Sequence, residues 1–235
     1  MAVAGADFRL LIFDWDGTLS DSAAMIVNAM QAAIRGLGLP PRSDAAIREL
    51  IGLGLNEGLE RLYPDTDIPD LRRLLDSYRA RWLSEGGGEA PLFAGALEAV
   101  GRLHGQGYRI AIATGKSRAG LNRSLAHHAA LRAYVHASRT ADETASKPNP
   151  LMLGELLAET GLGPAEALMI GDTDFDLDMA RSIGMPALGV TCGVHAPERL
   201  RAAGAAALLD AVADLPGWLQ RRREALSPTP ETQGS

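Results

Sequence analysis

Two aspartates, Asp14 and Asp16, directly follow a short apolar run at residues 9–13. Apolar runs of this length that end in turn residues are typical of strands covered on both faces, so both carboxylates would lie at one edge of a sheet. Each raises the pKa of the other unless a cation lies between them, and Mg²⁺ prefers such oxygen ligands. One carboxylate could then attack an electrophile while the other transfers a proton. An acidic turn without a chemical role explains the same residues equally well.

A second polar segment, Thr114-Gly115-Lys116-Ser117, follows another apolar run at residues 109–113. Its Gly-Lys-Ser order resembles a nucleotide-binding P-loop, but that motif requires a glycine five residues before Gly115, where this chain has Ile110. What remains is a hydroxyl group and backbone N–H groups at the start of a helix capped by Ser117, which can hold an anion. Threonine and glycine are common at strand ends, so this segment alone is weak support for an anion site.

The third segment is a lysine in a proline-stiffened loop, Ser146-Lys147-Pro148-Asn149-Pro150. Only Lys116 and Lys147 are lysines among the 23 basic side chains of the chain. A lysine fixed in this way could neutralise both a nucleophilic carboxylate and a bound phosphate. In a chain where arginine fills most basic positions, we favour this interpretation over an exposed surface lysine.

The fourth segment carries alternating acids after the apolar run at residues 167–170: Asp172, Asp174, Asp176 and Asp178. A calcium-binding EF-hand is excluded, because its sixth position, counted from Asp172, is Leu177 where glycine is required. At a strand end, Asp172 would point to the same edge as Asp14, with Asp176 one helical turn further on. Asp174 and Asp178 are expected to face solvent or to cap the helix.

Strand-like and helix-like patterns alternate from about residue 90 onward. Further strands are predicted at residues 187–190 and 207–209, with a weaker candidate at 134–137. This alternation predicts an α/β fold, a Rossmann-like parallel sheet with helices on both faces. Ligands bind such sheets beyond the carboxyl ends of the strands, where the four polar segments would meet.

Residues 20–89 interrupt that alternation with four amphipathic helical patterns and no strand. An all-helical insert after the first strand, returning through Gly86-Gly87-Gly88, predicts a cap over a catalytic core. A helical decoration without a role in catalysis is the alternative. The predicted organisation is a core of residues 1–19 and 90–225, a cap of residues 20–89 and a disordered tail of residues 226–235.

The bulk properties exclude several classes of protein. The chain has 235 residues and a net charge of −6, so no basic surface for nucleic acid is expected. Its single cysteine, Cys192, excludes an internal disulfide and a cysteine-based zinc site. No apolar run reaches the roughly 18 residues that cross a membrane, and residues 1–7 are too short for a signal peptide. We therefore expect a cytoplasmic protein without a membrane partner.

Taken together, the four segments resemble the motifs of the haloacid dehalogenase-like hydrolases. The family's Asp-x-Asp-Gly-Thr motif matches Asp14 to Thr18, and the following Leu19-Ser20-Asp21-Ser22 is similar to the phosphoglycolate phosphatase-like branch. Thr114 matches the second motif, Lys147 the third, and Gly171, Asp172 and Asp176 the fourth. The helical insert is similar to the C1 cap of the family.

The resemblance implies a Mg²⁺-dependent phosphatase that acts on a small phosphorylated metabolite. Asp14 would form an aspartyl-phosphate, and Asp16 would protonate the leaving oxygen and then activate water. The phosphoryl oxygens would be held by Thr114 and Lys147, with Gly115 and Lys116 as further substrate-binding residues.

The resemblance also implies the metal ligands. Mg²⁺ would be bound by the Asp14 carboxylate, the Asp16 backbone carbonyl and Asp172. Asp176 would lie just behind these ligands.

Relatives with the same fold suggest other reactions. Asp16 argues against a dehalogenase, which needs no leaving-group proton, and the absence of lysine from residues 20–90 excludes a phosphonatase that forms a Schiff base. A phosphohexose mutase similar to β-phosphoglucomutase and a non-catalytic phosphometabolite sensor stay open.

The substrate and the oligomeric state are not predicted. Phosphoglycolate, a sugar phosphate and a nucleotide are all compatible with the motifs. Arg48, Asn56 and Glu57 are candidate cap contacts around the turn Gly52-Leu53-Gly54, which could dip toward the site. His127-His128 is interpreted as a surface pair.

Overall fold

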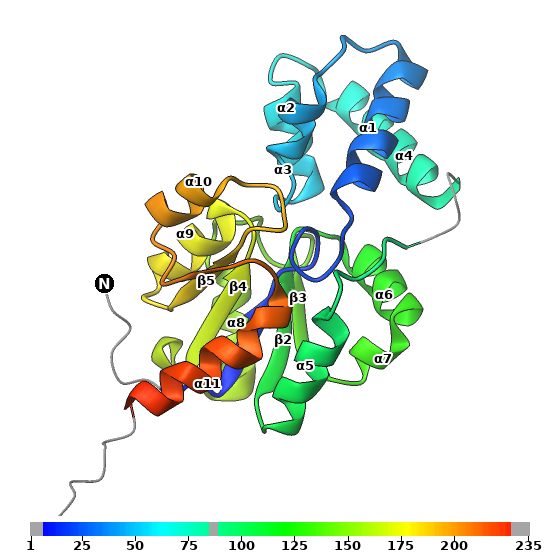
Figure 1. Cartoon of the computed structure of the whole chain (residues 1–235). Coiled ribbons are helices and arrows are strands. Elements are labelled where there is room, and N and C mark those ends of the chain that lie inside the picture. The colour runs from blue at the N-terminus through cyan, green and yellow to red at the C-terminus, as the bar shows by residue number, and fades with distance from the viewer. Residues whose placement is uncertain (1–6, 85–88, 227–235) are drawn as a thin grey trace, which may run out of the picture.

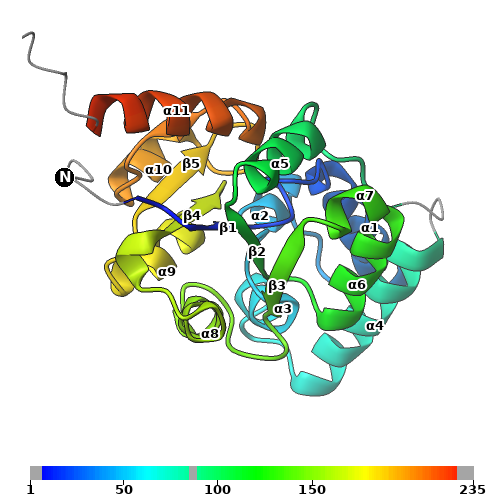
Figure 2. The same cartoon turned by 90° about the horizontal axis from the view of Figure 1, so that it is seen from below.

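A six-stranded, wholly parallel sheet forms the centre of the computed structural model, which describes residues 7–84 and 89–226 (Figures 1 and 2). The strand order is β3-β2-β1-β4-β5-β6. The strands are β1 (Leu10–Phe13), β2 (Arg109–Thr114), β3 (Val135–Thr140), β4 (Ala167–Gly171), β5 (Ala187–Val190) and β6 (Leu208–Leu209).

Helices cover both faces of this sheet, which explains why its central strands are apolar throughout. In β1, Leu11 and Phe13 belong to one apolar cluster, and Leu10 and Ile12 belong to another. Successive residues of a strand point to opposite faces, so a strand covered on both sides carries no polar alternation. The first face packs against α5 (Ala96–Gly105), α6 (Arg118–His127), α7 (Ala129–Arg132) and α11 (Leu215–Leu226). The second packs against α8 (Leu151–Thr160), α9 (Asp174–Ser182) and α10 (Pro197–Ala202).

The predicted α/β fold is therefore confirmed, with differences at the edges of the sheet. The weak strand expected at residues 134–137 is β3, which runs from Val135 to Thr140. As an edge strand it pairs only with β2 and is half-exposed, so its sequence lacks the apolar run that marks a central strand. Two 3₁₀ turns, Pro164–Glu166 and Val212–Asp214, complete the connections.

Four helices connect β1 to the rest of the sheet and lie beyond the carboxyl ends of the strands (Figure 1). We call them the cap helices: α1 (Ala23–Leu37), α2 (Asp44–Arg48), α3 (Leu55–Leu62) and α4 (Ile68–Ser84). Gly38 ends α1 with φ of 65°, a conformation that favours glycine, and the Ser43 side chain accepts a hydrogen bond from the Ala46 N–H at the start of α2. Their apolar residues form a third cluster, separate from the two beside the sheet.

Some sequence-based expectations lie outside the described residues. These are Gly86-Gly87-Gly88, most of the N-terminal leader and residues 227–235 of the predicted tail; Leu226 is the last residue of α11. Within residues 7–84 and 89–226, no helix combines the length and the apolar character that a membrane crossing requires.

Candidate active site

The parallel pairing of three strands brings the predicted site residues to one edge of the sheet. β1 pairs with β2 on one side and with β4 on the other. Asp14 follows β1, Thr114 ends β2, and Asp172 follows β4, so the three side chains meet although the chain separates them widely. All three are buried.

Lys147 lies in the middle of this group and is completely buried. Its Nζ atom is 2.6 Å from Asp14 Oδ1 and 2.7 Å from Asp176 Oδ1. Burial lowers the pKa of Lys147, but the charges of Asp14 and Asp176 outweigh it and raise the pKa above its ordinary value. The lysine is therefore a charged bridge between two carboxylates, and the interpretation as an exposed surface lysine is wrong.

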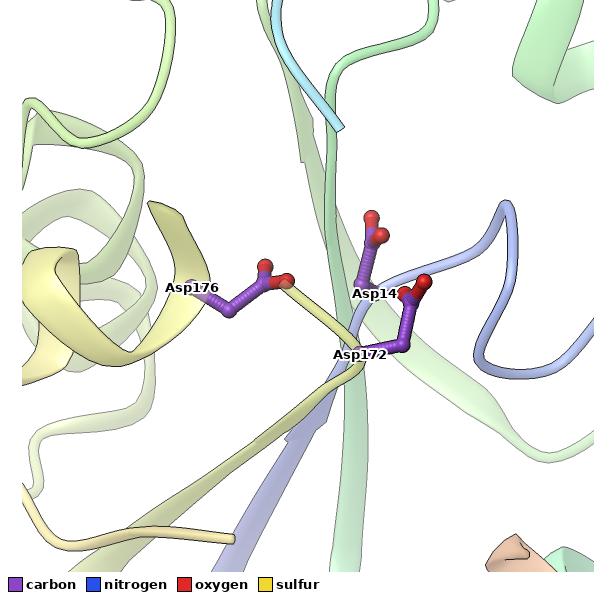
Figure 3. A group of neighbouring side chains, drawn as sticks. All are labelled: Asp14, Asp172 and Asp176. Carbon is purple, nitrogen blue, oxygen red and sulfur yellow. The ribbon is translucent and has the colours of Figure 1, made fainter. Parts of the chain in front are cut away.

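Asp14, Asp172 and Asp176 form a compact group of carboxylates (Figure 3). One oxygen from each lies within 4.8 Å of the others. Asp172 accepts hydrogen bonds from the Thr18 hydroxyl at 2.8 Å and from the Val194 N–H at 2.9 Å. Apart from the Lys147 ammonium, no described group donates a hydrogen bond to either oxygen of Asp14. The Asp14 carboxylate is thus buried with free lone pairs, held by an ion pair alone.

Burial raises the pKa of both Asp14 and Asp172. The pKa of Asp14 lies well above its ordinary value, because desolvation outweighs the lowering by Lys147. Desolvation and the charge of Asp176 raise the pKa of Asp172 to about 7. Three buried carboxylates face one lysine, so the group has an excess of negative charge that a divalent cation would relieve.

The residues present therefore fit a Mg²⁺ ion. Its hard oxygen ligands would come from carboxylates, and Asp14 Oδ2, which has no partner among the described residues, is available for it. The backbone is shaped around Asp172: a Cβ atom on Gly17, where φ is 85°, would lie 2.2 Å from Asp172 Oδ2, and one on Gly193 would lie 2.1 Å from it. Glycine is required at both positions for the loops to close around this carboxylate.

The Asp16 side chain is not part of the carboxylate group. It accepts hydrogen bonds from Lys116 Nζ at 3.0 Å and from the Ser22 hydroxyl at 2.7 Å. Lys116 also lies 5.1 Å from the ring centroid of Trp82 in α4. The Asp16 carboxylate is thus occupied by Lys116 and Ser22, and the predicted metal site takes only the backbone carbonyl of this residue. Lys116, predicted to bind substrate, contacts the proposed acid/base.

The turn Gly52-Leu53-Gly54 between α2 and α3 reaches the core. The Gly54 N–H donates to Ser146 Oγ at 2.8 Å, next to Lys147. A Cβ atom on Gly115 would lie 2.3 Å from the Leu53 carbonyl oxygen, so Gly115 gives the turn the room to approach. The turn therefore dips toward the site, as the sequence analysis considered possible.

A cavity of about 980 Å³ lies between the cap helices and this edge of the sheet. Asp14, Asp16 and Thr114 contribute to its wall on the sheet side, and the candidate cap contacts Asn56 and Glu57 line it on the other. Arg48 is not among its lining residues. The site residues thus open into a space between the sheet and the cap helices that is large enough for a ligand.

Other predicted residues lie away from the cavity. His127 is exposed, whereas His128 is half-buried and contacts the Ala90 carbonyl oxygen at 3.0 Å. Asp174 pairs with Arg199 at 2.6 Å, and Asp178 pairs with Arg181. At the start of α9, the Thr173 hydroxyl accepts the capping hydrogen bond from the Asp176 N–H, and the Asp176 carboxylate accepts one from the Thr173 N–H in return.

Sequence analysis missed three groups that hold the site together. Thr18 ends the first motif and Ser22 lies four residues after it, so their positions close to Asp14 and Asp16 were a signal; the Thr18 hydroxyl donates to Asp172 and the Ser22 hydroxyl to Asp16. The Val194 N–H comes from the loop after β5 and is 22 residues from Asp172. Almost any residue type can supply a backbone N–H group, so no pattern in the sequence pointed to this donor.

Comparison with known proteins agrees with this geometry. The model of the haloacid dehalogenase-like hydrolase family matches residues 11–190. The chain belongs to this family. The haloacid dehalogenase-like relatives include "Probable phosphatase IndB" of Dickeya dadantii, 36% identical over 213 residues that cover 88% of this chain and 92% of the relative. A phosphoglycolate phosphatase of Mesorhizobium japonicum is 29% identical over 78% of this chain and 83% of its own length.

A solved structure shares the fold of this hydrolase. The haloacid dehalogenase-like family protein of Streptococcus pneumoniae superposes with a TM-score of 0.78 at 23% identity, covering 91% of this chain and 99% of that protein. These matches confirm the predicted family, the predicted fold and the prediction that the chain is an enzyme.

Proposed function

We propose that this hydrolase is a Mg²⁺-dependent phosphatase that cleaves a phosphate monoester of a small metabolite through an aspartyl-phosphate. The observation that carries the proposal is the Asp14 carboxylate. It is buried, lines the cavity and has the buried Lys147 ammonium as its one partner among the described residues. An anionic nucleophile with free lone pairs beside a fixed cation suits attack on a phosphoryl group.

In the proposed reaction, Asp14 attacks phosphorus and the bond from phosphorus to the ester oxygen breaks. Asp16 gives a proton to that oxygen, so the alcohol leaves neutral. Asp16 then takes a proton from water, which cleaves the aspartyl-phosphate to inorganic phosphate and restores Asp14. One ester and one water thus become one alcohol and one phosphate.

The fixed polar groups would stabilise the charge on the transferring phosphoryl group. Lys147 neutralises part of it, and the Thr114 hydroxyl and the backbone N–H groups after β2 can donate to its oxygens. Mg²⁺, held by Asp14, the Asp16 carbonyl and Asp172, would supply further positive charge there. Asp176 would keep Lys147 in place at 2.7 Å.

The cap helices would exclude bulk water and restrict access to small molecules. The names of the curated relatives, a probable phosphatase and a phosphoglycolate phosphatase, support the reaction class. We keep a cytoplasmic location as part of the proposal, since Cys192 has no second cysteine to form an internal disulfide with.

The test is phosphate release from p-nitrophenyl phosphate with Mg²⁺ and with EDTA. We expect Mg²⁺-dependent turnover that Asp14→Asn abolishes. Asp178→Asn is the matched control, because this carboxylate pairs with Arg181 on α9 outside the site. Absence of turnover on any ester from folded, Mg²⁺-loaded protein would refute the proposal and favour the mutase or sensor alternatives.

A further inference from the structure

The cavity above Asp14 is much larger than a phosphoryl group requires. Its volume of about 980 Å³ is at the upper end of the range in which proteins bind drug-sized ligands. The wall opposite the sheet comes from all four cap helices and the turns between them, and its side chains include Ile26, Leu50, Leu55, Tyr78 and Trp82. The part of the substrate that leaves as the alcohol would lie against these apolar and aromatic groups.

The basic residues in the cavity wall are already paired with carboxylates. Among its lining residues, Lys116 pairs with Asp16 at 3.0 Å, Arg123 with Glu89 at 2.6 Å, and Arg79 more loosely with Asp76 at 4.0 Å. A second anionic group on the substrate, such as the carboxylate of glycolate, would compete with a close carboxylate partner at Lys116 and Arg123 and would find only the exposed Arg79 loosely paired.

Acidic side chains in the cavity wall also disfavour a negatively charged substituent. Glu57, Glu60 and Asp142 also line the cavity; Glu57 is paired with Arg61, so a carboxylate in the substrate would meet like charges chiefly at Glu60 and Asp142. An apolar substituent needs no cationic partner and is not repelled by these carboxylates, and its transfer from water into the cavity is favourable.

On the basis of the proposed phosphatase function, we propose that the natural leaving group is a bulky, mainly apolar alcohol. It is larger than a two-carbon acid or a short polyol and occupies the space between the sheet and the cap helices. The same catalytic residues would serve any ester, so the wall of the cavity decides which one is cleaved.

A homologous series of ethyl, butyl and hexyl phosphate tests this inference. Their leaving alcohols are equally reactive, so kcat/KM compares binding of the alkyl chain alone. We expect kcat/KM to rise about fourfold per methylene that enters the cavity. Phosphoglycolate should be cleaved less efficiently than butyl phosphate.

A pair of variants links this preference to the cavity. Leu50→Trp would fill part of the wall, so the ratio of kcat/KM between hexyl and ethyl phosphate should fall at least fivefold. Leu75→Trp is the matched control: Leu75 is also half-buried in the cap but does not line the cavity, so the ratio should be kept. Circular dichroism establishes that both variants are folded.

Each outcome has a separate meaning. A flat series in the wild type, or preference for phosphoglycolate, overturns the apolar leaving group while Mg²⁺-dependent hydrolysis of the esters leaves the phosphatase function intact. An unchanged ratio in folded Leu50→Trp overturns the role of the cavity wall. No hydrolysis of any ester overturns the proposed function itself and this inference with it.

Discussion

Replacing Lys147 with methionine should destabilise the protein far more than removal of an exposed ion pair. Methionine keeps the length and apolar stem of lysine but not its charge. The substitution leaves Asp14 and Asp176 buried without the cation that lies 2.6 and 2.7 Å from them. Removing one partner of a buried ion pair typically costs about 3–5 kcal/mol.

The control is Arg9→Met, which removes an ion pair to Glu166 at 3.0 Å. Its side chains are 60% and 40% exposed, whereas those of Lys147 and Asp14 are 0% and 1% exposed. An exposed pair contributes about 0–1 kcal/mol, so the two substitutions should differ several-fold in their effect on the free energy of unfolding.

The pH dependence follows from the sign of the pKa shift. The folded-state pKa of Lys147 lies above its unfolded value of 10.5, so the contribution of its charge is fully present below pH 10.5 and is lost only as the pH rises through the folded value. The variant should therefore be destabilised across the neutral range. The loss should be smaller at pH 5 than at pH 8, because the unpaired carboxylates can then take up protons.

The assay is equilibrium unfolding in urea, followed by circular dichroism in EDTA at both pH values. A loss below about 1 kcal/mol at pH 8, equal to that of Arg9→Met, would refute the reasoning. It would mean that Lys147 is not charged between the two carboxylates in the folded protein. In the phosphatase assay, the folded variant should lose about two to three orders of magnitude in kcat, as expected for removal of a fixed group that stabilises the transition state.

Three further predictions concern the metal, the cap and the proton transfer. Burial raises the folded pKa of Asp172 to about 7, so its carboxyl destabilises the metal-free protein as the pH rises from its unfolded pKa of 3.8 through 7. Mg²⁺ should therefore raise Tm more at pH 8 than at pH 5.5. Asp172→Asn should abolish that difference in the Tm shift. Gly115→Ala should lower kcat/KM at least tenfold and also lower Tm, because the new methyl group would lie 2.3 Å from the Leu53 carbonyl oxygen and force the cap turn to move; unchanged kinetics would show that the cap turn does not need this approach. Asp16→Asn should slow cleavage of alkyl phosphates by about two to four orders of magnitude. Cleavage of p-nitrophenyl phosphate should slow by less, since nitrophenolate leaves without a proton. An equal loss of rate on both kinds of ester would argue against Asp16 as the acid.

Much of the fold was predictable because apolar strand runs and amphipathic helices leave periodic signals. β1, β2, β4 and β5 were predicted to within one residue at each end. The edge strand β3 was the weak case, because a strand with one neighbour does not need to be apolar throughout. The predicted meeting of Asp14, Thr114 and Asp172 followed from parallel topology alone.

The less predictable part of the site consists of contacts between distant segments. Lys116 and Asp16 are separated by 100 residues, and neither residue type specifies the other as its partner. Asp176 was expected just behind the metal ligands, and one of its carboxylate oxygens lies within 4.8 Å of an oxygen of Asp14 and of Asp172. Such details depend on loop conformations and rotamers, which periodicity does not determine.

The separate apolar cluster of the cap helices bears on how this chain can change over evolutionary time. Substitutions that reshape the cavity wall act on a unit with its own packing, while the two clusters beside the sheet continue to hold Asp14, Lys147 and Asp172 in place. Distant sites without shared partners have nearly additive effects on stability. A library of substitutions confined to the cap could therefore retarget the hydrolase to new esters while the chemistry is inherited unchanged.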